Sequence, residues 1–451
     1  MTKSIFERYY PQFLLMILAF TFFTRMYRLN IPERYEFDEV YHAVTAKLMV
    51  DGDMRAYEWT NPPPEPNTAV DWLHPPYAKL TQAASMSIFG KNSFGWRFSS
   101  VIFGVLVVYV TAKIAEELFN KKNLALLSAF LVSLDGLLFT MSRIAMNDVH
   151  VTFFILLSIW QYLRYINSKR KLKQILIFSS IAAGFAVGSK WSGVFAIGFI
   201  GINELFYTLK TFFSENKKKL FKKINLTFFR QQVLLIIVSC LLIPSLLYLG
   251  SYSHMFYLGK DFHHLVEMHK NTWWYQTNLT ATHPAQSKPI QWFLNTKPVW
   301  ITVAYEGRNI RGDIYAVGNP ALFWFADIAV FMTFFIIIKH KIKKSRFTKS
   351  LNIKMLSILM FAYLIVWLPW QLSPRIMFFY HYLPAVPLLT INLAYWLNKM
   401  WDSQRFRALA FLLVFIIFGA FVVWYPHLSL IPVPLTIKDG IYFYFDFWKQ
   451  A

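Results

Sequence analysis

The sequence has only one cysteine, Cys240, and it lies inside an apolar run. A single cysteine excludes a disulfide within the chain and any metal site built from several cysteines. Charged residues are also scarce, at 16% of the 451 residues, whereas soluble domains contain about 25%. Acidic residues are the rarer sign, because 24 Asp and Glu stand against 46 Lys and Arg.

Apolar residues take the place of the missing charges. The chain is 56% hydrophobic and 19% aromatic, it contains 45 Phe, and its mean hydropathy is +0.37. This composition is typical of an integral membrane protein whose main surroundings are a lipid bilayer. The net charge of +22 could suggest a nucleic-acid partner, but that interpretation requires a basic face on a soluble domain. We therefore expect no nucleic acid.

Long apolar runs predict an all-α polytopic protein, because a helix of roughly 17–25 apolar residues crosses a bilayer. About eleven runs qualify by this criterion. They lie near 11–28, 97–113, 124–141, 148–165, 174–188, 191–209, 232–250, 320–338, 352–371, 376–397 and 407–424. The first run is followed by "TRMYRLN" and by no small-residue cleavage site, so we expect an uncleaved span instead of a signal peptide.

The positive residues predict the orientation of these spans. With a cytoplasmic N-terminus, the short inside loops hold more than half of the Lys and Arg residues, including the runs in 210–230 and 339–349. Two large loops, 29–96 and 251–319, then lie together on the non-cytoplasmic face. We find no internal repeat and no appended soluble domain, so we expect residues 1–451 to form one transmembrane domain.

The first large loop carries most of the candidate reactive groups. "YEFDEVYHA" places Asp38 and Glu39 just after the first span, where carboxylates are costly unless water, a partner or a function keeps them there. In "DWLHPPYAKL", two prolines should hold His74 and Lys79 in a rigid turn. The loop ends at Arg97, which a simpler interpretation assigns to snorkelling towards headgroups.

The other predicted span ends add charges to the same face. "MSRIAMNDVH" contributes Arg143 and Asp148, and Asp148 could simply complement a helix dipole. "VGSKWSGVF" adds Lys190, and "SPRIMFFYHYLP" adds Arg375 and His381. We expect His381 to pair inside the bundle. Each residue has an ordinary explanation by itself, but their convergence on one face predicts a site.

Cations beside acids at a membrane surface suit an anionic lipid headgroup, and a sugar linked to polyprenyl phosphate is such a ligand. The phosphate is a good leaving group that needs positive charge, which arginines provide. An acceptor hydroxyl needs a base, for which a carboxylate is adequate. One displacement with one base would invert the anomeric centre, by analogy with inverting glycosidases.

The two adjacent acids should have different roles, because neighbouring residues on an extended segment point in opposite directions. One would face the acceptor and the other would brace the structure. Asp, Glu and His could also hold a divalent metal. The candidate site has no HxxxH or Asp-x-Asp spacing, and "DGD" at 51–53 is typical of a turn, so we expect no metal and no other cofactor.

Eight motifs, in order, resemble the protein O-mannosyltransferase family of the GT-C class. They are "FDEVYHA", "HPPYAK", "WRFSS", "SRIAMND", "GSKWSG", "HPAQSKPIQWFLNTKPVW", "GNPALFW" and "SPRIMFFYHYLPAVP". The resemblance covers nearly the whole chain and implies a GT-C-like bundle. It also implies that Asp38 is the catalytic base, with Glu39 beside it. Arg97, Arg143, Lys190 and Arg375 would bind the donor phosphate, and His74, Lys79, Asp148 and His381 would support the site. Asn147 stands where the family usually has Leu.

The second loop is too short for the large soluble MIR domain of eukaryotic members, so the chain resembles the bacterial branch. This implies a plasma-membrane enzyme that uses polyprenyl-phosphate-mannose. The acceptors would be Ser or Thr of exported proteins, which the secretion channel could deliver to a site on the non-cytoplasmic face.

Two other functions compete with this one. A related GT-C enzyme could move a sugar from polyprenyl phosphate to a glycolipid, because it would share the Asp-Glu pair and the HPP turn. A transporter or flippase would instead show repeated halves with interrupted spans and polar groups at mid-membrane. The predicted polar groups lie at one face and no repeat is present, which disfavours transport.

Overall fold

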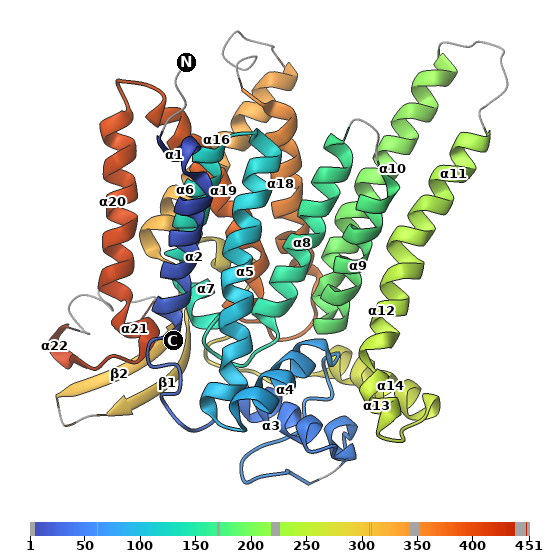
Figure 1. The fold of residues 1–451 in the computed structure, drawn as a ribbon, viewed down its shortest axis with the longest axis vertical. Helices are drawn as coiled ribbons and strands as arrows, with labels where there is room; N and C mark the ends of the chain where they lie inside the picture. Colours follow the sequence, from blue (N-terminus) through green and yellow to red (C-terminus); the bar gives the residue numbers. More distant parts are fainter. Residues whose placement is uncertain are drawn as a thin grey trace.

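The computed structural model describes residues 5–60, 62–168, 172–217, 226–305, 307, 309–342, 351–437 and 448. The chain is mostly helical, and long helices run side by side through most of its height (Figure 1). This confirms the predicted helical membrane fold, to which the chain adds one small sheet that the all-α prediction lacked. The helices of the bundle are α1 (Ile5–Arg8), α2 (Tyr10–Met26), α5 (Ser93–Phe119), α6 (Lys122–Ser133), α7 (Gly136–Met141), α8 (Asp148–Asn167), α9 (Lys173–Ser189), α10 (Val194–Lys217), α11 (Leu226–Ile237), α12 (Ile243–Ser251), α16 (Pro320–Ile342), α18 (Ile353–Trp367), α19 (Val386–Trp401) and α20 (Arg407–Trp424).

In the part of the chain that the structure describes, seven helices are long and apolar enough to cross a membrane. They are Ser93–Phe119, Asp148–Asn167, Trp191–Phe213, Thr227–Ser251, Pro320–Ile342, Ile353–Leu372 and Arg407–Trp424. The helices Tyr10–Met26, Lys122–Ser133 and Lys173–Ser189 are apolar but shorter. These helices support a multi-pass membrane protein, and each of the eleven predicted runs contains at least one helix. The exact number of spans stays a prediction.

Some of the predicted runs are not single α-helices. The run predicted at 124–141 is broken between α6 and α7, because the Asp135 carboxylate accepts the Leu138 N–H at 2.7 Å and starts a new helix. The run at 232–250 contains a π-helical turn, η3 (Val238–Leu242), between α11 and α12. The run at 376–397 begins with the 3₁₀ helix η5 (Phe379–Ala385) before α19.

The two predicted large loops are folded, and both lie at the end of the bundle away from the N-terminus (Figure 1). Residues 29–96 form α3 (Glu39–Val50), the 3₁₀ helix η1 (Met54–Tyr57) and α4 (Tyr77–Phe89). The prolines of the HPP motif come just before α4, so they mark the start of a helix. The second segment holds α13 (Ser253–Tyr257), α14 (Phe262–Asn278) and α15 (Pro289–Phe293). Parts of the predicted inside loops, at 169–171, 218–225 and 343–350, lie outside the described residues.

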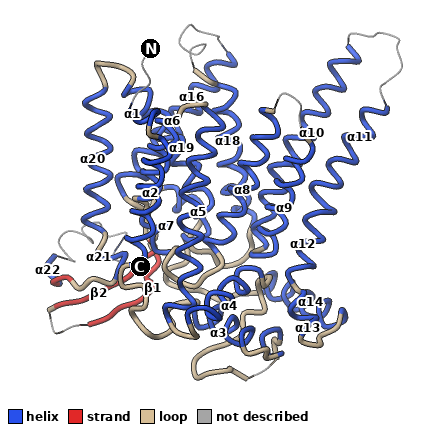
Figure 2. Tube along the Cα trace, viewed as in Figure 1, coloured by secondary structure: helices blue, strands red, loops and turns tan. Residues whose placement is uncertain are grey.

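A small antiparallel sheet completes the same end, shown red in Figure 2. Strands β1 (Val299–Tyr305) and β2 (Ile310–Ala316) form a hairpin, and β3 (Val433–Pro434) pairs with β2. Two short helices, α21 (Pro426–Ser429) and α22 (Leu435–Ile437), flank β3.

Three connections bring the predicted motifs towards this end. The 3₁₀ helix η2 (Trp191–Gly193) joins α9 to α10, and η4 (Leu368–Leu372) follows α18. The 142–147 connection leads into α8, which packs against α5 and α9. Residues of all three connections line one cavity together with Asp38, at the start of α3.

Candidate functional site

The first predicted motif lies at the start of α3. Phe37 has a φ of 53°, a left-handed conformation that is uncommon for a bulky residue. The Asp38 carbonyl accepts the N–H groups of Tyr41 and His42 at 3.0 Å. Asp normally caps a helix with its side chain at this position, but the Asp38 carboxylate makes no such bond. It lines a cavity instead, and is free to act there.

Glu39 has entirely different surroundings, because its side chain is fully buried. Arg97 donates to it twice, at 2.8 Å to Oε1 and at 2.7 Å to Oε2. Glu39 also accepts the backbone N–H groups of Ala145 and Glu36, both at 3.0 Å. The remaining Arg97 donors reach the carbonyls of Leu29, Pro32 and Arg34. This ion pair therefore ties the first loop to α5 and to the connection before α8.

Arg143 is also held within the protein, through both terminal nitrogens of its guanidinium. Its guanidinium donates to the carbonyls of Arg25 and Tyr27, both at 2.6 Å, and to that of Arg28 at 3.3 Å. Arg143 and Arg97 line a separate hollow of only about 20 Å³. Neither arginine lines the cavity at Asp38.

Asp71 is the centre of a buried polar cluster beside that cavity. His42 Nδ1 lies 2.8 Å from Oδ2 and His74 Nδ1 lies 2.9 Å from Oδ1. Lys79 donates to Asp71 Oδ2 at 2.9 Å, to the Asp71 carbonyl at 2.6 Å and to the His74 carbonyl at 2.8 Å. A carboxylate only accepts hydrogen bonds, so both imidazoles carry a proton on Nδ1 and have only Nε2 left for other partners.

The electrostatics of the cluster agree with these hydrogen bonds. Burial by itself would raise the pKa of Asp71, but His74, Lys79 and His42 together hold that pKa well below its usual range. Burial lowers the pKa of His74 to about 4, despite the opposing effect of Asp71, so this imidazole is neutral at pH 7. Burial also lowers the pKa of Lys79, and its ion pair with Asp71 acts in the other direction.

Two predicted residues that line the cavity form an ion pair with each other. Lys190, which ends α9, donates to Asp148 Oδ1 at 2.8 Å. The Lys190 ammonium also lies 5.5 Å from the centre of the Tyr380 ring. Asp148 is the first residue of α8, so it complements the helix dipole as well as pairing with Lys190.

Arg375 and His381 approach from the segment between α18 and α19. The Arg375 guanidinium donates to the Gln276 side chain of α14. The His381 ring stacks on Trp292 at 6.0 Å and meets Trp370 edge-on at 4.6 Å, while its Nδ1 lies 3.0 Å from the Phe378 carbonyl. Arg375 therefore joins α14 to the cavity, and His381 packs within the bundle.

These side chains enclose what we call the Asp38 cavity, of about 370 Å³. Its lining residues are Asp38, His42, Leu73, His74, Met146, Asp148, Lys190, Trp191, Ser192, Val194, Phe195, Trp273, Gln276, Thr277, Trp370, Ser373, Pro374, Arg375, Tyr380 and His381. Of the predicted site residues, Asp38, His74, Asp148, Lys190, Arg375 and His381 line it, while Glu39, Lys79, Arg97 and Arg143 do not.

Burial and the neighbouring charged groups together shift the pKa of the Asp38 carboxyl. Burial raises the pKa of Asp38, and the charges of His42 and Lys190 act against this rise. The negative charges of Asp148 and Asp71 add to it. A carboxylate with a raised pKa holds a proton more readily than an ordinary one, which suits a general base.

A divalent metal is the one inorganic group that these residues could hold. Ligand atoms of His42, Asp71 and His74 all lie within 4.8 Å of one another, and His with Asp is a set that zinc accepts. However, the Lys79 ammonium already pairs with the Asp71 carboxylate, at 2.9 Å from Oδ2. Its positive charge would repel a metal ion at the same carboxylate. The observed hydrogen bonds also satisfy both carboxylate oxygens.

Sequence reasoning missed several residues of the Asp38 cavity. His42 follows Asp38 by four residues and lies one turn along α3, so a helical interpretation of "DEVYHA" would have revealed it. Asp71 stands three residues before His74 in "DWLH". Tyr380 stands beside His381 in the "SPRIMFFYHYLPAVP" motif. Gln276 carries no local signal, because only the folded chain brings α14 to this end.

Known structures with the same fold define the class of protein. A Saccharomyces cerevisiae structure, the protein O-mannosyltransferase Pmt1-Pmt2 complex bound to the sugar donor, matches with a TM-score of 0.81. The match covers 99% of this chain and 93% of that chain at 14% identity. ArnT from Cupriavidus metallidurans, bound to undecaprenyl phosphate, matches with a TM-score of 0.56 and 12% identity over 94% of this chain and 75% of its own. The fold is therefore that of the GT-C membrane glycosyltransferases.

Sequence comparison then gives the family. The family described as "Dolichyl-phosphate-mannose-protein mannosyltransferase" matches residues 15–256, and "C-terminal four TMM region of protein-O-mannosyltransferase" matches residues 261–432. The chain belongs to the protein O-mannosyltransferase family and is a glycosyltransferase, as its motifs indicated.

Curated relatives agree with this family. The "Polyprenol-phosphate-mannose--protein mannosyltransferase" of Corynebacterium glutamicum is 24% identical over 387 residues, which cover 74% of this chain and 72% of the relative. The protein of the same name from Mycobacterium tuberculosis is 24% identical over 376 residues, which cover 71% of this chain and 69% of the relative.

Proposed function

We propose that this protein transfers mannose from a polyprenyl-phosphate-mannose donor to Ser or Thr hydroxyls of exported proteins. The names of the curated relatives support the donor and the protein acceptor. The observation that carries the proposal is the Asp38 carboxylate, which lacks a cap hydrogen bond and shares one cavity with Lys190 and Arg375. A base and two phosphate-binding cations are what such a transfer needs.

We assign the donor phosphate to the Lys190 and Arg375 side of the Asp38 cavity. Both cations line the cavity and have only one or two polar partners. The guanidinium groups of Arg97 and Arg143 already donate within the protein. For these two arginines we therefore propose bracing in place of the phosphate contact that their motifs suggested.

The reaction follows from this arrangement as one displacement. The acceptor oxygen attacks the anomeric carbon while the bond from that carbon to the phosphate oxygen breaks, so the configuration inverts. The hydroxyl proton passes to Asp38, and the phosphate leaves with its charge stabilised by Lys190 and Arg375. No covalent sugar–enzyme intermediate is needed.

The His42–Asp71 pair supports the base. His42 lies one helical turn beyond Asp38, and Asp71 fixes its tautomer through the 2.8 Å contact to Nδ1. Nε2 is then left for the cavity, where the positive charge of His42 favours the ionised form of Asp38 while Asp71 holds the ring in place. This is the orienting role that a carboxylate has in a hydrolase triad.

We propose that the enzyme lies in the plasma membrane, with its N-terminus in the cytoplasm and the Asp38 cavity on the outer side. The basic loops of the sequence support this orientation. Acceptors would then be exported chains that reach the cavity from the aqueous side, where the secretion channel could deliver them. We also propose that no metal takes part, because Lys79 neutralises Asp71.

The test is a reconstituted assay with a defined product. Purified protein in liposomes that contain a glycolipid acceptor receives polyprenyl-phosphate-mannose and a Ser/Thr-containing peptide, and mass spectrometry locates the added hexose. We expect hexose on a Ser or Thr, at the same rate with and without a chelator. Hexose confined to a glycolipid acceptor would contradict the proposal and favour the glycolipid transferase, and a loss of activity with chelator would contradict the metal-free mechanism.

A further inference from the structure

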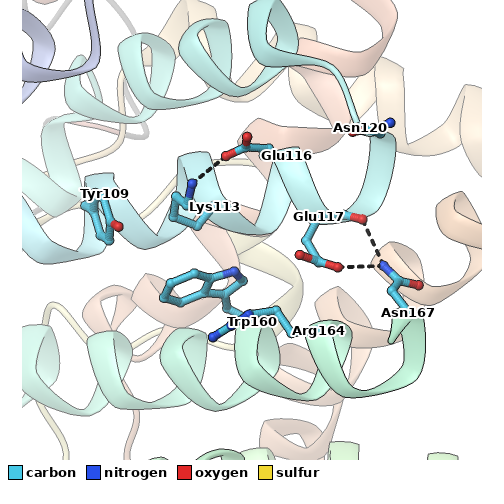
Figure 3. A pocket seen from close by; sticks show the side chains of 8 residues that line it. All are labelled: Tyr109, Lys113, Glu116, Glu117, Asn120, Trp160, Arg164 and Asn167. Atoms are coloured by element: carbon cyan, nitrogen blue, oxygen red, sulfur yellow. Dashed lines mark hydrogen bonds and ion pairs between the residues drawn. The ribbon is translucent and has the colours of Figure 1, made fainter. Parts of the chain in front are cut away.

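A second polar cavity lies at the far ends of the helices that build the site. Arg97 and Asp148 lie near the first residues of α5 and α8, whereas this cavity of about 620 Å³ lies near their last turns. Figure 3 shows it between the two helices. Its lining residues are Tyr109, Lys113, Glu116, Glu117, Asn120, Trp160, Arg164 and Asn167. We call it the α5–α8 groove.

Lys113 and Glu116 form an ion pair in the groove, so their charges cancel each other. Lys113 donates to Glu116 Oε2 at 2.5 Å, and the Tyr10 hydroxyl donates to the same oxygen at 3.1 Å. Both charged side chains are about three-quarters buried. Neither of them needs a ligand.

Two further charges in the groove have only neutral partners. Glu117 Oε1 accepts from the Asn167 amide at 3.0 Å. Arg164 donates to Gln161 at 2.9 Å and lies over the Trp160 ring at 5.5 Å. Within the part of the chain that the structure describes, neither Glu117 nor Arg164 forms an ion pair. One extends from α5 and the other from α8 (Figure 3), so the groove has one anion and one cation on facing walls.

An apolar stripe leads from the groove along the same two helices. Its side chains recur every three or four residues, so they share one face of each helix. They are at least partly exposed: Ile102, Leu106 and Tyr109 on α5, and Phe153, Leu157 and Trp160 on α8. The Tyr109 and Trp160 rings meet edge-on at 6.2 Å, at the boundary between the stripe and the charges. Aromatic residues at such a boundary are typical of the membrane–water interface.

We propose that the α5–α8 groove binds a zwitterionic phospholipid with a primary ammonium group, of the phosphatidylethanolamine type. Arg164 would bind the phosphate, Glu117 would accept hydrogen bonds from the ammonium, and an acyl chain would lie along the apolar stripe. The charges of the groove sum to zero, which matches a zwitterionic headgroup and disfavours an anionic one. A quaternary ammonium has no N–H to donate to Glu117, so choline fits less well.

The test is native mass spectrometry of the purified full chain with added phosphatidylethanolamine, phosphatidylglycerol or phosphatidylcholine. We expect wild type to retain phosphatidylethanolamine preferentially, and the double variant Glu117→Gln/Arg164→Gln to retain at least about tenfold less, because two charge-assisted contacts are lost. Glu117→Gln alone leaves a net positive groove and should reverse the preference towards phosphatidylglycerol.

The matched control is Lys121→Gln/Asp402→Asn, which removes an exposed ion pair between the α5–α6 and α19–α20 connections. This control should bind all three lipids as wild type does. Equal retention of the three lipids by wild type would overturn the proposal, as would unchanged phosphatidylethanolamine binding in the double variant. Soluble glycerophosphoethanolamine should compete poorly, because it lacks the acyl chains, and equal competition would overturn the lipid assignment. None of these results depends on the transferase activity.

Discussion

At the scale of single residues, a charged group is available for a ligand only where it lacks partners inside the protein. Glu39, Arg97 and Arg143 are buried and hydrogen-bonded within the protein, so their motifs contribute to the architecture. Asp38 has no cap hydrogen bond, although it stands beside Glu39 in the chain. The adjacent acids therefore have unequal surroundings, as expected from the sequence. The expectation assumed an extended segment, in which neighbouring side chains point in opposite directions. In the structure Asp38 and Glu39 instead begin helix α3.

The stabilisation that the Glu39–Arg97 ion pair contributes can be measured by a double-mutant cycle on these two residues. Glu39→Gln leaves a buried guanidinium without its carboxylate, so we expect a loss of about 3–5 kcal/mol in the free energy of unfolding. Glu39→Gln/Arg97→Met should lose less than the sum of the two single variants. Denaturation in detergent gives the values, and strictly additive losses would show that the two side chains do not act together.

The role of His42 can be read from the pH dependence of the transfer rate. Asp38 acts as a base only when ionised, so the rate should rise with pH through a pKa that burial places above the ordinary Asp value. The charges that face Asp38 are His42 and Lys190, which lower this pKa, and Asp148 and Asp71, which raise it. His42→Ala removes a lowering charge, so the rising limb should move to higher pH. His74→Ala is the matched control, and a limb that does not move in His42→Ala would contradict the assignment.

At the scale of elements, the position of Lys190 depends on the tight turn from α9 through η2 into α10. Gly193 lies so close to α9 that an added Cβ would meet the carbonyl carbon of Ala186 at 2.2 Å and the nitrogen of Val187 at 2.3 Å. These atoms are backbone and cannot move aside separately. The "GSKWSG" motif is thus explained by packing, which holds Lys190 against Asp148.

Gly193→Ala should displace η2 and with it Lys190, and so weaken donor binding. We expect the KM for the lipid donor to rise by about tenfold or more, since a charge-assisted contact to phosphate is worth roughly 1.5–3 kcal/mol. Gly201→Ala in α10 is the matched control, because its Cβ would meet only Cys240 Sγ at an ordinary 3.5 Å. Equal KM values in the two variants would show that the turn does not position Lys190.

At the scale of the whole molecule, sequence reasoning was most effective for the bundle and least effective for the cavity. Apolar runs predicted the helices because burial in lipid demands them over their full length. The break at Asp135 and the 3₁₀ turn of η5 were missed, since each depends on one local hydrogen bond or proline. The partners of the cations were missed for another reason. Arg97 meets Glu39 across 58 positions, and a sequence shows that a charge is present without showing what neutralises it.

The arrangement of both folded loops at one end can be tested by labelling. In a Cys240→Ser background, single cysteines at Asp51, Lys270 and Asp402 report on the two loops and on the opposite end, and all three side chains are at least 40% exposed. A maleimide that cannot cross membranes should label the Asp51→Cys and Lys270→Cys variants from the same side of oriented vesicles. Asp402→Cys should react only after permeabilisation. Labelling of all three from one side would contradict the proposed topology.

The measurement that tests the central claim most directly is the initial rate of mannose transfer by Asp38→Asn in liposomes, with polyprenyl-phosphate-mannose and an acceptor peptide. Asp51→Asn, which changes an exposed acid of the same loop, is the control. We predict a fall of about 10²-fold or more for Asp38→Asn, since a general base contributes roughly 10²–10⁴ to a rate, with an unchanged melting temperature and a control like wild type. A rate for Asp38→Asn within about twofold of the control would contradict the account, because the base would then lie elsewhere.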